Sequence, residues 1–245
     1  MQPSRRLSLF AAFLFSLVGL GQGAVPSAAK ILTLPVPEWT AIGAEADRAL
    51  RAGSWELGRD AAERLISQIL SRPAQGQGLD TLLARSVAYR AIGLAGVGKT
   101  EASAWAAATA RELGFRAKDL DLSAYGKPGE MVRAALDPAP VEAEPLQVGN
   151  GISRPQIVER TSPFYPPTLR EALVGGTVIV DAVIGLDGKT RTPHVLHSPS
   201  IFLSLAALDS LQSWRFTPAQ REGKPIAVSY VLTVNFSIDP PQPQK

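Results

Sequence analysis

Two sets of residues in this 245-residue sequence have types and spacing that could do chemistry. The first is the stretch from Gly93 to Thr100, GLAGVGKT, which matches the phosphate-binding loop pattern G-x-x-x-x-G-K-[ST]. In such a loop, backbone N–H groups and the N-terminus of the next helix converge on the phosphates of a nucleotide. The second set is His194 and His197, because imidazole is a common metal ligand.

The residues before the glycine-rich stretch argue against nucleotide binding. A phosphate-binding loop follows a buried strand, but residues 84–92 include Arg85 and Arg90. A central strand would bury both arginines, whereas a helix would place them on its polar side. We therefore expect a helix-loop-helix at residues 93–100 and keep a nucleotide hydrolase as the least favoured function.

The remaining chemistry-bearing residues do not assemble into an active site. His194 and His197 are three apart on an expected strand, so their side chains face opposite sides and cannot share a metal. The sequence has no cysteine and no G-x-S-x-G motif. We therefore predict a protein that is not an enzyme and has no cofactor and no metal. The net charge of +3 is not clustered, and nucleic acid is not an expected partner.

Residues 38–136 are predicted to form an all-α module of helical hairpins. Helical periodicity extends over residues 40–52, 55–70, 79–95 and 101–113, with a short further helix at 129–136. One expected buried stripe runs along Leu57, Ala61, Leu65 and Ile69. The segments that begin at residues 58 and 98 are similar to each other and weakly resemble tetratricopeptide repeats. Such a module binds a partner or serves as a spacer.

The C-terminal region has the pattern of a small α+β domain. Residues 228–238 alternate apolar and polar side chains, which predicts a long half-buried strand without charge or proline up to Ser237. Residues 176–184 and 189–197 form a predicted hairpin through Asp187-Gly188. Helices are expected at 167–173 and 198–213, the latter capped by Ser200. The predicted fold is α-β-β-α-β, with both helices covering one face of a three-stranded antiparallel sheet of order 2-1-3.

The motifs of this region, in their order and spacing, resemble the C-terminal domain of the TonB family. They are Tyr165-Pro166, the strand led by Gly176, Asp187-Gly188-Lys189, Ser198, Trp214-Arg215-Phe216-Thr217-Pro218-Ala219, Gly223-Lys224-Pro225 and Val234-Asn235-Phe236. The resemblance implies a domain that binds TonB-dependent outer-membrane transporters by pairing with their extended TonB box. Trp214 and Phe216 are expected in the core of this domain.

An exposed edge strand can recruit an extended peptide through backbone hydrogen bonds, which is consistent with this resemblance. The expected partner-binding residues lie on the last strand and on the segment that approaches the domain. They are Arg160, Thr161, Ser162, Phe164, Tyr165, Ser229, Val231, Thr233 and Asn235. Two alternatives to peptide capture are that two copies of the chain pair along this edge, or that another part of the chain covers it.

The N-terminus indicates export. Arg5 and Arg6 precede an uncharged run that ends in small residues, which predicts a signal peptide at residues 1–24 and a periplasmic protein. The alternative is an uncleaved anchor in the inner membrane. Residues 137–151 are a predicted Pro/Ala/Glu linker, and residues 152–240 the TonB-like domain.

Two functions follow from these expectations. The first is a TonB-like protein that supports energy-coupled transport, with the ExbB–ExbD motor as a further partner if the N-terminus is retained. Family members that transmit force use an anchored histidine, and no histidine precedes His194 here. The second function is a periplasmic scaffold that uses the domain for another partner.

Overall fold

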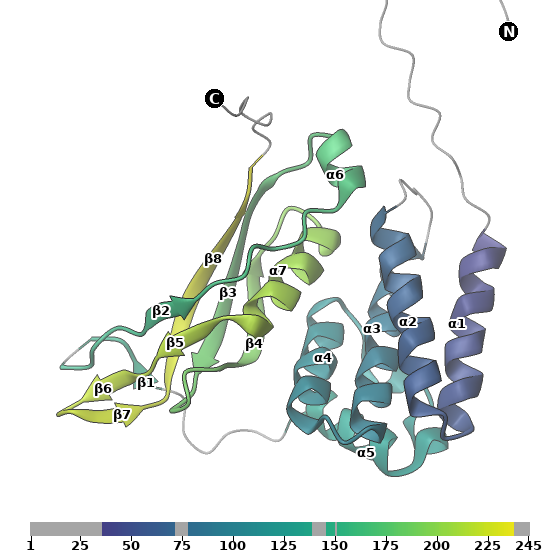
Figure 1. Cartoon of the computed structure of the whole chain (residues 1–245), viewed down its shortest axis with the longest axis horizontal. Coiled ribbons are helices and arrows are strands. Elements are labelled where there is room, and N and C mark those ends of the chain that lie inside the picture. Colours follow the sequence, from purple (N-terminus) through teal and green to yellow (C-terminus); the bar gives the residue numbers. More distant parts are fainter. Residues whose placement is uncertain (1–35, 72–77, 139–145, 150, 238–245) are drawn as a thin grey trace, which may run out of the picture. The chain divides into compact units, whose positions relative to one another are not determined.

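The computed structural model describes residues 36–71, 78–138, 146–149 and 151–237 (Figure 1). The predicted signal peptide or anchor lies outside these residues, as do most of the predicted linker and Ile238 at the end of the predicted last strand. Within the described ranges, no helix is long and apolar enough to cross a membrane.

The first half of the described chain is helical, as the sequence predicts. Its α-helices are α1 (Val36–Arg51), α2 (Trp55–Ser71), α3 (Leu79–Gly96), α4 (Thr100–Glu112) and α5 (Gly126–Leu136). Short 3-10 helices lie at Ala117–Asp119 and Leu122–Tyr125. Leu65, Ile69 and Leu83 are fully buried between these helices. Leu57, expected on the buried stripe, is 67% exposed because the buried line of α2 instead runs through its small residues, Gly58, Ala61 and Ala62.

The second half contains the sheet and two more helices. Its elements are β1 (Leu146–Gln147), β2 (Gln156–Glu159), α6 (Pro167–Glu171), β3 (Gly176–Ile184), β4 (Thr190–His197), α7 (Ile201–Ser213), β5 (Arg215–Thr217), β6 (Ala219–Arg221), β7 (Lys224–Ile226) and β8 (Val228–Phe236). The protein is therefore α+β, as predicted, and β4, β3 and β8 occur in the predicted order.

The predicted three-stranded sheet is wrong in detail. The main sheet has four strands in the order β1-β8-β3-β4 and is mixed, because β1 pairs parallel with the start of β8. Two further antiparallel pairs, β2 with β5 and β6 with β7, form separate small sheets. These added strands are only two to four residues long, which is too short for an alternating apolar pattern to stand out.

The apolar face of the main sheet is covered by α7. Alternate residues of β3 are buried, including Val178, Val180 and Ile184, and they share a core with Leu208 and Trp214 at the C-terminal end of α7. The side chain of Ser200 accepts a hydrogen bond from the N–H of Phe202 at 3.2 Å, which confirms the predicted cap. Trp214 and Phe216 are buried, as expected.

The described residues belong to one compact unit, in which the helical half and the sheet half share core residues. Trp105 of α4 packs in the core of the sheet, and Leu205 of α7 packs in the core of the helices. The indole N–H of Trp105 donates to the carbonyl of Leu208 at 3.2 Å.

A buried ion pair joins α3 to α7. The guanidinium of Arg90 donates to both carboxylate oxygens of Asp209, at 2.8 and 3.2 Å. Arg90 is only 8% exposed, so the prediction that a helix would place it on its polar side is wrong. The sequence of α3 alone could not reveal this, because the carboxylate that compensates the burial lies 119 residues further along the chain.

Candidate partner-binding edge

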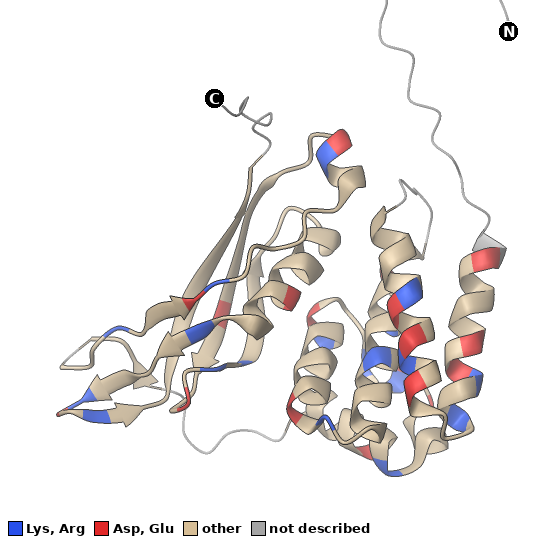
Figure 2. Ribbon diagram, in the orientation of Figure 1, with Lys and Arg blue, Asp and Glu red and all other residues tan. Residues whose placement is uncertain are grey.

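The last strand, β8, provides a regular and uncharged backbone. It pairs residue by residue with β3, from Gly176 opposite Phe236 to Ile184 opposite Val228, with no bulge. Along the second half of β8, Leu232, Val234 and Phe236 are buried and the residues between them are exposed. Figure 2 shows no charged residue on this strand. Pairing with β3 along one edge therefore keeps β8 regular over its whole length.

The opposite edge of the sheet, β4, is contacted by the helical half. A carboxylate oxygen of Glu112, at the end of α4, accepts the backbone N–H of Val195 at 2.9 Å and lies 3.1 Å from Nδ1 of His194. Pro193 supplies no N–H for a ladder. The β4 edge therefore offers a poor template for a further strand.

Within the described part of the chain, the outer edge of β8 is paired only at its start. Leu146 and Gln147 of β1 pair with Val228 and Ser229, so the predicted binding residue Ser229 lies beside the chain's own strand. Beyond Ser229, no strand of the described residues pairs with the outer side of β8. The open edge is therefore Tyr230–Phe236, which includes three of the four binding residues expected on this strand, namely Val231, Thr233 and Asn235.

Side chains on the polar face of the sheet fix β8 against β3. The hydroxyl of Ser229 donates to Asp181 at 2.5 Å, and the hydroxyl of Thr177 lies 2.9 Å from the side-chain oxygen of Asn235. Val231 projects between these two contacts and is 54% exposed. The polar face thus leaves the apolar side chain of Val231 accessible near the start of the open edge.

The predicted approach segment packs against the end of the same sheet. The carbonyl of Thr161 accepts the indole N–H of Trp214 at 2.9 Å, and the guanidinium of Arg160 lies 4.7 Å from the centre of that ring. The ring of Tyr165 meets Phe236, the last residue of β8, edge to face at 5.5 Å.

Not every residue of the approach segment is available to a partner. The Tyr165 hydroxyl donates to the carbonyl of Val174 at 3.0 Å. The carbonyl of Thr161 is already engaged by the indole N–H of Trp214. Ser162 is exposed and Phe164 is 55% exposed. Phe164 is therefore an exposed aromatic residue directly beside Tyr165, which contacts the end of β8.

The glycine-rich stretch has a packing role. Residues 93–96 belong to the end of α3, which is a helix and not the strand that a phosphate-binding loop follows. A Cβ added to Gly96 would lie 2.2 Å from the ring of Trp55, and one added to Gly93 would lie 2.6 Å from Cβ of Arg59. These glycines let α2 and α3 approach closely, and the nucleotide-binding interpretation is wrong.

The prediction that the two histidines face opposite sides is wrong. A register shift in the β3–β4 pairing places His194 opposite Asp181 and His197 opposite Ile179, which share the polar face of β3, and both histidines are exposed. Among the described residues, no group of three or more His, Asp or Glu side chains could hold a metal ion.

Sequence reasoning missed the two features that distinguish the sheet edges. β1 has two exposed residues and carries no periodic signal. Glu112 is one of many charged residues at a helix end, and its contact with β4 joins residues 83 positions apart. Both features depend on how distant segments pack.

Comparison with known proteins agrees with this geometry. Residues 161–238 match the family model described as "Gram-negative bacterial TonB protein C-terminal". No curated protein matches the chain. The matched residues extend from the approach segment through the whole of β8, so this part of the chain is similar to a TonB C-terminal domain.

Proposed function

We propose that residues 152–240 form a binding domain that captures an extended segment of an outer-membrane transporter by adding it as a strand to β8, in support of energy-coupled transport. This proposal rests on the stretch Tyr230–Phe236, which pairs with β3 on one side and with no described strand on the other. The opposite edge of the same sheet is contacted by α4. The TonB C-terminal family acts in transport at the cell envelope and is a family of interaction proteins, not of enzymes.

The chemistry of the open edge favours an uncharged or weakly polar strand. Thr233 and Asn235 offer hydrogen-bonding side chains on the exposed face, and Val231 offers an apolar one. Cross-strand pairs of β-branched and apolar side chains stabilise such a contact by about 0.2–1 kcal/mol each. Phe164 lies in the approach segment and gives the incoming chain an aromatic residue to pack on.

The contact is expected to be weak and short-lived. A single added strand with one or two anchoring side chains buries less than about 1,200 Å², which is the lower range of specific interfaces. Weak binding is appropriate for a protein that engages and releases transporters repeatedly.

We place this activity in the periplasm, with the protein exported by residues 1–24 or held by them in the inner membrane. In the anchored form, the ExbB–ExbD motor becomes a further partner. The alternative function, a periplasmic scaffold, uses the same edge for another protein or for a second copy of the chain. The helical half serves either function by covering β4 and leaving β8 as the available edge.

In-cell crosslinking from a single cysteine tests the proposal, because the natural chain has no cysteine. Val231→Cys places the thiol on the open edge, and Leu196→Cys is its matched control on β4. The two parent side chains are 54% and 53% exposed, so accessibility does not separate them. We expect Val231→Cys to capture outer-membrane transporters through their N-terminal segments, and Leu196→Cys to capture none.

The same experiment separates the alternatives. Recovery of only self-crosslinked dimers, or of an unrelated periplasmic protein, from Val231→Cys would replace the transporter proposal with the scaffold. Equal capture of transporters from both cysteines would show that contact does not depend on the β8 edge.

A further inference from the structure

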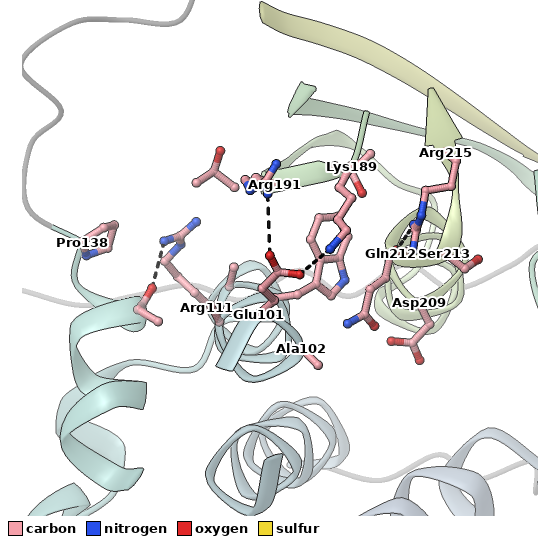
Figure 3. A pocket seen from close by; sticks show the side chains of 16 residues that line it. Glu101, Ala102, Arg111, Pro138, Lys189, Arg191, Asp209, Gln212, Ser213 and Arg215 are labelled. Atoms are coloured by element: carbon pink, nitrogen blue, oxygen red, sulfur yellow. Dashed lines mark hydrogen bonds and ion pairs between the residues drawn. The ribbon is translucent and has the colours of Figure 1, made fainter. Parts of the chain in front are cut away.

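A cavity of about 610 Å³ lies between α4, the start of β4 and the end of α7, with the end of α5 at one side (Figure 3). The cavity lies at the β4 edge of the main sheet, across the sheet from the open edge of β8. The proposed strand capture does not use it. Its volume is in the range of pockets that bind small molecules.

The cavity is lined mainly by apolar surface. Alanines of α4, including Ala102 and Ala108, form this surface together with Trp105, and Pro138 adds to it. Trp105 is fixed by its hydrogen bond to the carbonyl of Leu208. A ligand with an apolar body would therefore meet a preformed surface.

Cations outnumber carboxylates among the residues that line the cavity. Arg111, Lys189, Arg191 and Arg215 line it, against Glu101 and Asp209. Two of these cations also have partners outside the lining, because Arg191 pairs with Asp187 at 2.7 Å and Arg111 with Glu112 at 3.4 Å. Asp209 is already paired with Arg90, outside the lining. The guanidinium of Arg215 donates only to the carbonyls of Gln212 and Trp214, and no carboxylate of the described residues lies within ion-pair distance of it.

A carboxylate of the chain already occupies the position that an anion would take. Glu101 lies 2.6 Å from the ammonium of Lys189 and 3.8 Å from the guanidinium of Arg191. Figure 3 shows its carboxylate directed toward both cations. The hydrogen bond from Lys189 lowers the pKa of Glu101. The Glu101 side chain is 67% exposed, and an ion pair this exposed is weak enough to be displaced.

The cavity wall also contains backbone strain. Thr192 has a φ of 44°, which is unusual for a β-branched residue, and Pro193 follows it. The β3–β4 register shifts at this point. Strained residues concentrate at functional sites, and this one shapes the wall that carries Lys189 and Arg191.

We propose that this cavity binds a small aliphatic carboxylate, whose carboxylate group replaces that of Glu101 beside Lys189 and Arg191 and whose alkyl chain lies along Trp105 and the alanines of α4. The mainly apolar lining favours such an amphipathic anion over a phosphate, which would leave the apolar surface unused. Glu101 acts as an internal competitor that closes the site when no ligand is present.

Titration of the full-length protein with butyrate, hexanoate and octanoate, followed by the backbone amide NMR shifts of α4 and β4, tests this proposal. Affinity should rise with chain length, by up to about fourfold for each buried CH₂. Octanamide, which has the same chain without the charge, should bind far more weakly. Shifts should appear at Glu101–Arg111 and Lys189–Thr192, and not along β8.

Three variants are expected to change the affinity for octanoate in opposite directions. Glu101→Gln removes the competitor and should tighten octanoate binding about two- to fivefold, whereas Lys189→Gln and Arg215→Gln should weaken it by a similar factor. No saturable shifts in Glu101→Gln, equal binding of octanoate and octanamide, or weaker binding by Glu101→Gln would overturn the proposal. Because the readout is confined to α4 and β4, failure here is distinguishable from failure of strand capture at β8.

Discussion

Replacing Asp209 by alanine removes the partner of the buried arginine that joins α3 to α7. Arg90 would then keep only a distant carboxylate, that of Glu63 at 3.8 Å from its Nε. Burial lowers the pKa of Arg90, but attraction and hydrogen bonding to Asp209, together with attraction to Glu63, raise it by more, so the guanidinium is charged and needs a carboxylate partner.

The free-energy change follows from the exposure of the two side chains. Removing one partner of a fully buried ion pair costs about 3–5 kcal/mol. The Asp209 side chain is 37% exposed, so water can reach part of the vacated space. We therefore expect Asp209→Ala to lower the free energy of unfolding by about 2–3 kcal/mol.

Urea denaturation followed by tryptophan fluorescence and circular dichroism measures this loss. The double variant Arg90→Met with Asp209→Leu should be more stable than Asp209→Ala, because it leaves no buried charge. Glu45→Ala breaks the exposed Glu45–Arg64 pair, whose side chains are each more than half exposed, and should change stability by less than about 1 kcal/mol. The reasoning is refuted if Asp209→Ala costs no more than Glu45→Ala.

Three further variants test other parts of the structure. Glu222 and Gly223 both have positive φ in the β6–β7 turn, so Glu222→Asn should stabilise the protein by about 0.5–1 kcal/mol in urea denaturation, and an unchanged midpoint would contradict this. Gly188 has a φ of 72°, and an added Cβ would lie 1.9 Å from the carbonyl oxygen of Phe216, so Gly188→Ala should cost about 2–4 kcal/mol in the same assay. Burial, and then a hydrogen bond to a carboxylate, raise the pKa of Tyr125, so the folded state keeps a proton that the unfolded state loses above about pH 10. Stability should therefore fall with rising pH between about pH 10 and pH 11, and less so in Tyr125→Phe; parallel pH profiles would refute this.

Local patterns were sufficient to predict the regular parts of the fold. The alternation along β3 and β8, the cap at Ser200 and the turn at Gly188 are short-range signals, and each element occurs where they place it. The strand order followed from the hairpin and from Pro193, which belongs on an edge.

The parts that sequence could not predict depend on long-range packing. Arginine is usually exposed, but Arg90 is buried because the carboxylate of Asp209 compensates its charge. The two residues of β1 narrow the open edge from all of β8 to Tyr230–Phe236, yet they have no pattern of their own. The cavity beside α4 is lined by residues of α4, α5, β4, α7 and β5, which are spread over the sequence, so no motif marks it.

Hydrogen exchange of the β8 amides tests the central claim most directly. It would be measured on the full chain with and without the transporter segment captured by Val231→Cys. If the segment adds as a strand, exchange should slow at amides within Tyr230–Phe236 and stay unchanged along β4. Binding that slows exchange on β4 or α4, and leaves β8 unchanged, would contradict the claim that this open edge is the partner-binding site.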